Sequence, residues 1–127
     1  MTQESKTDET RQARCERGEE KLLEIAGQEG KEALVPLGDL GRYAIEFAYG
    51  DIYRREGLSL RDRMIVTVAA LIVLGGRQEE LRLHLDSALN VGLSPEEIEE
   101  IIIQTVPYAG FPTAINALQA LRERTSG

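Results

Sequence analysis

The segment from Met64 to Leu74 places the strongest constraint on what this chain can fold into. Its side chains are apolar on almost every side of a helical wheel, with Thr67 as the interruption. A helix of this kind is normally buried among other helices. Ser59 followed by Asp62 resembles a helix-capping box, and Gly75-Gly76 is a typical helix end. The segment therefore predicts a central buried helix.

Helical start and stop signals recur along the rest of the chain, and no stretch shows the alternation of a β-strand. We expect a first helix from Thr10 that ends near Gly27 and Gly30, and a second from about Asp39 to Tyr53. After the Met64–Leu74 segment, a further helix should end at Asn90 and Gly92. The next should start at Ser94-Pro95 and be disturbed by Pro107, and Pro112 should open the last one. The sequence thus predicts an all-α fold of about six helices. We expect residues 1–9 to form a disordered tail and residues 10–127 a single helical domain.

Composition narrows the possible partners and the compartment. The chain has 127 residues and a net charge of −7, which argues against nucleic acid or an anionic membrane as a partner. Cys15 is the single cysteine, so neither an internal disulfide nor a thiolate metal cluster is expected. No apolar run reaches the roughly 18 residues of a membrane span. We expect a cytoplasmic protein without a metal.

Three polar residues at helical spacing form the candidate site. Arg77, Glu80 and His84, the single histidine, lie at i, i+3 and i+7 and so share one side of a helix. His84 falls at the border of the apolar stripe that includes Leu81 and Leu85. Such a group suits a partly dry cleft. The alternative is a histidine hydrogen-bonded at a helix interface, beside an exposed Arg–Glu pair.

Four segments resemble the carboxymuconolactone decarboxylase family, which is related in fold to the AhpD-type alkyl hydroperoxidases. They are 46–53, 57–63, 80–90 and 108–117. The peroxidase branch of this family carries a Cys-x-x-Cys-x-x-x-His motif, and its histidine matches His84. The cysteine positions fall on Arg77 and Glu80, so the dithiol that a peroxide-reducing cycle needs is absent.

The resemblance implies a cofactor-independent decarboxylase acting on a small carboxylated lactone such as γ-carboxymuconolactone. His84 is then the proton donor or oxyanion partner, and Glu80 orients its imidazole. Arg77 binds a substrate carboxylate, while Tyr49 and Tyr108 supply hydroxyl donors. The anionic substrate is the expected small-molecule partner. The resemblance also implies a homo-oligomer, a trimer or hexamer.

Two other functions stay open at this point. One is a redox-related, alkyl hydroperoxidase-like member that has lost the dithiol, and the other is a non-catalytic oligomeric binding protein. The missing cysteines count against the first, and Cys15 is expected to be inert. The retained polar group around His84 counts weakly against the second. Asn116 could belong either to a functional site or to a structural helix interface.

Overall fold

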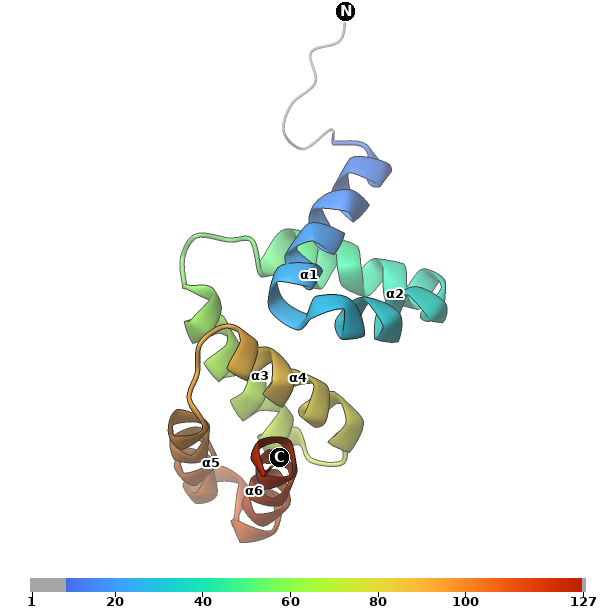
Figure 1. Ribbon diagram of the computed structural model, residues 1–127. Coiled ribbons are helices and arrows are strands. Elements are labelled where there is room, and N and C mark those ends of the chain that lie inside the picture. Colours follow the sequence, from blue (N-terminus) through green and yellow to red (C-terminus); the bar gives the residue numbers. More distant parts are fainter. Residues whose placement is uncertain (1–8, 127) are drawn as a thin grey trace, which may run out of the picture. The chain divides into compact units, whose positions relative to one another are not determined.

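The computed structural model describes residues 9–126, and every regular element in that range is helical (Figure 1). The all-α prediction is confirmed. The chain divides after Glu56 into two compact units, called unit 1 up to Glu56 and unit 2 from Gly57 onward. The predicted tail over residues 1–9 lies almost wholly outside the described residues, and the single domain over 10–127 stays a prediction. None of the helices in 9–126 combines the length and apolar character of a membrane crossing.

Unit 1 begins with a long, kinked helix. Helix α1 spans Arg11–Leu34, and the Thr10 hydroxyl caps it by accepting a hydrogen bond of 3.1 Å from the Ala13 N–H. Gly27 adopts the non-helical values φ 68° and ψ −166°, so two helical segments meet there at a sharp kink. The first segment ends at Gly27 as predicted, but helical structure resumes and passes through Gly30 to Leu34. The chain re-enters helical geometry directly after a single left-handed residue, a conformation that glycine adopts without a steric cost.

The second predicted helix, 39–53, is built from two different helical forms. After the short turn η2 (Val35–Leu37), α2 spans Asp39–Tyr43 and continues without a break into η3, a π-helix over Ala44–Ile52. Helix η3 packs against α1, with Leu22 and Ile25 of α1 and Ile45 of η3 buried. Long π-helical stretches are rare and occur often at functional sites.

Unit 2 is a bundle of four helices joined by short turns. Its helices are α3 (Leu60–Leu74), α4 (Gln78–Asn90), α5 (Pro95–Ala109) and α6 (Phe111–Thr125). Helix α3 packs against the other three, and α6 also contacts α4 and α5. The core is made by buried side chains from all four helices, among them Met64, Val68, Ile72, Leu85, Ile98, Ala117 and Leu121.

Helix α3 packs against the other three helices of unit 2, as expected of a central helix, but it buries one face only. Met64, Val68 and Ile72 are buried, whereas Val66 is 60% and Leu74 is 61% exposed. The buried residues recur at intervals of four, which places them on one side of the helix, toward its partners in unit 2. The segment thus contains more apolar side chains than the neighbouring helices bury.

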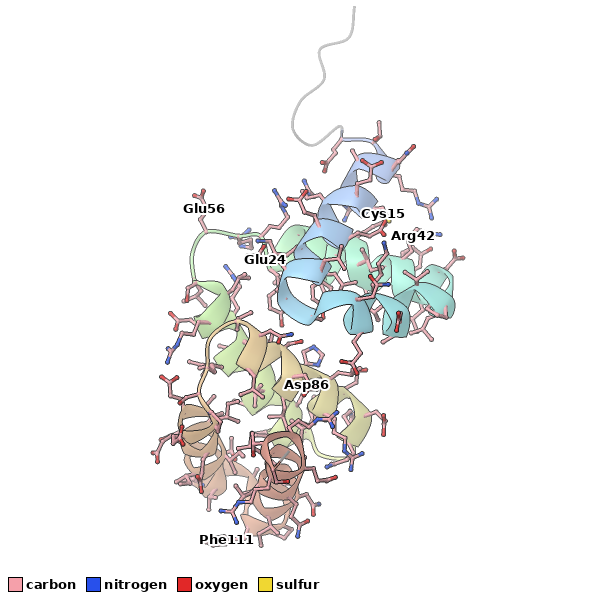
Figure 2. The ribbon with its side chains drawn as sticks, viewed as in Figure 1. Cys15, Glu24, Arg42, Glu56, Asp86 and Phe111 are labelled. Carbon is pink, nitrogen blue, oxygen red and sulfur yellow. The ribbon has the colours of Figure 1, made fainter. Side chains whose placement is uncertain are left out.

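Local signals set the ends of α5. Ser94 and Glu97 form a complete capping box, in which each side chain accepts a hydrogen bond from the other residue's N–H, and Pro95 follows at the first helical position. Pro107 does not end the helix, which continues to Ala109 before Gly110 turns the chain with φ 86°. Figure 2 labels Phe111, the first residue of α6, directly after this turn.

Candidate functional site

The imidazole of His84 is oriented by the backbone of its own helix. His84 lies in α4 and is partly exposed, and its Nδ1 is 2.8 Å from the main-chain carbonyl oxygen of Glu80. A carbonyl can only accept a hydrogen bond, so Nδ1 carries a proton and donates it. The ring is thereby held in one tautomer, and Nε2 is the atom left for chemistry.

The contacts of Glu80 and Arg77 differ from those that the spacing suggests. Glu80 holds the histidine through its carbonyl group, while its carboxylate is exposed in the first turn of α4. Arg77 is the N-cap residue, and its Nη1 donates a 2.9 Å hydrogen bond to the Gly75 carbonyl. Within residues 9–126, no hydrogen bond or ion pair joins the side chains of Arg77, Glu80 and His84 to one another. The three share a helix end but do not form a linked triad.

A small cleft opens at the start of α4, beside Arg77. It measures about 40 Å³, and its walls include Gly75, Gly76, Leu81 and Asn116, while His84 is not part of them. Gly75 and Gly76 both have positive φ, which turns the chain sharply from α3 into α4. This volume is well below the roughly 300–1,000 Å³ typical of small-molecule sites. Arg77 and the previously ambiguous Asn116 thus share this cleft.

The two tyrosines expected at the site lie in different units. Tyr108 is in α5 of unit 2 and is 78% exposed. Tyr49 is in η3 of unit 1, is 7% exposed, and stacks on Tyr53 with 5.2 Å between ring centroids and 19° between ring planes. Unit 2 therefore holds Arg77, Glu80, His84 and Tyr108, but no hydrogen bond joins Tyr108 to the other three within residues 9–126, and Tyr49 belongs to unit 1.

Sequence reasoning missed a buried carboxylate in η3. Glu46 is 5% exposed, with its Oε2 at 3.7 Å from Nε of Arg42 and 3.9 Å from Nε of Arg11. Figure 2 labels Arg42 on α2, the helix that continues into η3. Oε2 makes no hydrogen bond in the described part of the chain, and leaving a buried charged atom without one costs free energy. The signal in the sequence was a single acidic residue inside the apolar stretch 44–49.

A second cluster in unit 1 joins α1 to the end of η3. Asp51 accepts hydrogen bonds from Nη2 of Arg14 at 2.5 Å and Nη2 of Arg17 at 2.8 Å. The hydrogen bond from Arg14 is the main reason that the pKa of Asp51 lies below its ordinary value, and the same bond raises the pKa of Arg14. The cluster therefore stays ionised across the neutral range and ties the two helices together.

Cys15 has surroundings that disfavour thiolate chemistry. It lies in α1 and is partly buried, with its Sγ 3.8 Å from a carboxylate oxygen of Glu19. Burial raises the pKa of the thiol, and the negative charge of Glu19 raises it further. The reactive form of a cysteine is the thiolate, so this residue is a poor nucleophile at neutral pH.

Comparison with known proteins identifies the same family by a family model and by individual relatives. The model of the carboxymuconolactone decarboxylase family matches residues 38–123. The chain is 36% identical over 85 residues to 4-carboxymuconolactone decarboxylase of Acinetobacter baylyi, which covers 67% of this chain and 63% of that protein. It is 33% identical over 98 residues to an uncharacterized 15.0 kDa protein of Paracoccus denitrificans, covering 76% of this chain and 72% of the relative.

A third relative is the nitrosuccinic acid decarboxylase of Metarhizium robertsii, 33% identical over 75 residues, or 58% of this chain and 50% of that protein. The chain thus spans less than two thirds of the length of either named decarboxylase. The family match nevertheless includes α2, η3, α3, α4, α5 and most of α6. On this match and on its all-helical structure, the chain belongs to the carboxymuconolactone decarboxylase family.

Proposed function

We propose that this protein is a cofactor-independent carboxy-lyase acting on a small carboxylated lactone such as γ-carboxymuconolactone. The observation that carries the proposal is the imidazole of His84, whose Nδ1 proton is held by the Glu80 carbonyl so that Nε2 remains available. Family membership supports it, because two of the relatives are named as decarboxylases.

The proposed decarboxylation breaks one carbon–carbon bond and adds one proton. The bond between the ring carbon and its carboxylate breaks, and carbon dioxide leaves. The electron pair of that bond moves through the ring double bond onto the lactone carbonyl, which becomes an oxyanion. A proton then adds to carbon and the carbonyl re-forms. The protein has to hold the substrate carboxylates, stabilise the oxyanion and deliver one proton.

The residues of α4 suit these tasks. With Nδ1 bonded to the Glu80 carbonyl, the imidazolium form of His84 has one further donor, Nε2–H, for the oxyanion or for carbon. Arg77, one residue before α4, supplies a guanidinium for a carboxylate. Tyr108 carries an exposed hydroxyl on unit 2, and Tyr49 is proposed as a further donor from unit 1. The carboxylate of Glu80 is the least supported member, because its carbonyl already orients the ring.

The test is turnover of γ-carboxymuconolactone, followed by loss of substrate absorbance, in wild type and His84→Ala. We expect the wild type to turn over and the variant to lose about 100-fold or more, the usual contribution of a positioned acid or base. Arg82→Ala, on a different side of α4, is the matched control and is expected to keep its rate. Glu80→Ala retains the main-chain carbonyl and therefore separates the role of that carbonyl from the role of the carboxylate.

Two results would contradict the proposal. A wild type that does not act on the lactone would remove the substrate assignment. An unchanged rate in His84→Ala, with the circular dichroism spectrum of the wild type, would remove the histidine from the reaction. The redox alternative has less support, because Cys15 is the single cysteine and burial raises its pKa.

We also propose that the protein is a homo-oligomer, a trimer or hexamer. Unit 2 leaves several large apolar side chains of α5 and α6 exposed: Ile103, Tyr108, Phe111 and Ile115. Phe111, which is 68% exposed, is the first residue of α6. Exposed apolar side chains of this size are typical of surfaces that a protein partner covers, and a second copy of the chain is the proposed partner.

A further inference from the structure

Unit 1 contains an open pocket whose walls are mostly arginine. It has a volume of about 320 Å³ and lies where α1 meets the end of η3, lined by Arg17, Gly50, Asp51, Arg54 and Arg55. This volume falls at the lower end of the roughly 300–1,000 Å³ typical of small-molecule sites. None of the residues proposed for the decarboxylation belongs to it. The pocket is therefore a separate feature that the proposed function does not use.

The single acidic residue of the pocket is already paired. Both carboxylate oxygens of Asp51 accept hydrogen bonds from guanidiniums, one from Arg14 at 2.5 Å and one from Arg17 at 2.8 Å. Because its pKa is held below the ordinary value, Asp51 is a fixed anion and has no proton to offer a ligand at neutral pH. Its charge is balanced by Arg14 and Arg17, so it does not make the pocket repel anions.

Positive charge is left over around Asp51. Arg17 is also paired with Glu9 at 2.6 Å, but its Nε is buried and makes no hydrogen bond within residues 9–126. The Arg54 side chain is exposed, and no ion pair is found for it in the same range. Arginines thus outnumber carboxylates at this pocket, in a protein whose net charge is −7. Asp51 already lies between Arg14 and Arg17, so the charge that an added anion would meet at this pocket includes that of Arg54.

We infer that this pocket binds a small oxyanion, either an organic carboxylate or a phosphate. Guanidinium groups present paired N–H donors that match the oxygens of both anions, and Arg54 is the group whose donors are available for such a bond. The size of the pocket admits an organic acid as well as an inorganic ion. The inference does not depend on decarboxylase activity, because binding is measured without any lactone.

The experiment uses the full ¹⁵N-labelled chain, titrated separately with succinate and with inorganic phosphate at constant ionic strength. The signals to follow are the backbone amides of Gly50 and Asp51 and the side-chain Nε–H of Arg54. We expect saturable shifts at these positions. In Arg54→Ala, the affinity should fall about tenfold or more, since a hydrogen bond between charged groups is lost. Arg54→Lys keeps the charge but not the paired donors, so its affinity for the anion should lie between those of the wild type and Arg54→Ala.

The matched control is Arg122→Ala, an exposed arginine of α6 whose charge change equals that of Arg54→Ala. It should bind as the wild type does. Saturation by succinate alone would identify an organic acid as the ligand class, saturation by phosphate alone would identify phosphate, and saturation by both would support the shared oxyanion chemistry. Shifts that do not saturate, or equal affinities in wild type and Arg54→Ala, would overturn the inference. An equal loss in the Arg122 control would do so as well, because it would indicate a general effect of net charge.

Discussion

Gly18→Ala is expected to destabilise unit 1, because α1 and η3 meet at this residue with no room for a side chain. A Cβ atom at position 18 would lie 2.2 Å from the carbonyl oxygen of Ile45, 2.8 Å from its carbonyl carbon and 2.9 Å from its Cγ2. Ordinary contact starts at 3.4 Å, so the shortest of these distances is more than 1 Å too small. Two of the three atoms belong to the backbone and cannot move by a rotamer change, so the helices have to separate.

The expected magnitude combines two opposing effects. Overpacking of a close interface costs about 1–3 kcal/mol, and a backbone contact of this kind belongs at the upper end. Replacing glycine by alanine inside a helix returns about 1 kcal/mol through helix propensity. We therefore expect Gly18→Ala to lower the free energy of unfolding by about 2 kcal/mol.

Urea unfolding followed by circular dichroism at 222 nm measures this loss. Hydrogen exchange then locates it, with the greatest loss of amide protection expected in α1 and η3. Gly57→Ala is the matched control: the nearest atom to its Cβ is Nη2 of Arg63 at 3.9 Å, so it should cost nothing. If Gly18→Ala proves as stable as the wild type or more stable, the close approach of the two helices does not limit stability and the reasoning fails.

Two further predictions concern charge and assembly. Asp51→Asn should lower the free energy of unfolding most near neutral pH. Hydrogen bonding from Arg14 lowers the pKa of Asp51 in the folded protein. The stabilisation by Asp51 is therefore complete above the ordinary carboxyl pKa and is lost as the pH falls through the lowered pKa. Urea unfolding at several pH values should show the difference from wild type shrinking in acid; a difference independent of pH would contradict this. Light scattering after size-exclusion chromatography should give a homo-oligomer for wild type and a smaller species for Phe111→Asp, and a monomeric wild type would refute the assembly.

The parts of the fold that were predictable from sequence are those set by local signals. Ser59 and Ser94 each accept a hydrogen bond from an N–H three residues later, and the helices begin directly after them as expected. The π-helical form of η3 was not predictable, since the packing of α1 against it joins residues that are far apart in sequence. The break at Gly27 was predictable from the glycine itself, but the resumption of helical structure directly after it was not, because Gly30 suggested a continued interruption.

The sequence predicted which residues share a side of α4, but not which of their atoms contact one another. Helical spacing places Glu80 one turn before His84, and that turn does supply the group that holds the imidazole. The spacing cannot decide between the two acceptors that Glu80 offers, however, because its carboxylate and its carbonyl are both within reach of a side chain four residues on. The carbonyl is fixed by the helix and needs no side-chain ordering, which favours it. Glu46 was missed because its burial depends on α1 and α2.

The π-helical geometry of η3 has a consequence for which residues can meet α1. In an α-helix, Glu46 and Asp51 would point about 140° apart, since each residue turns the chain by about 100°. The wider turn of a π-helix, which bonds each residue to the fifth one along, brings the two carboxylates toward the same side. Arg11 reaches Glu46, while Arg14 and Arg17 reach Asp51. The wider turn therefore lets one side of η3 present two carboxylates to α1, so that three arginines of α1 contact η3 at two separate points along its length.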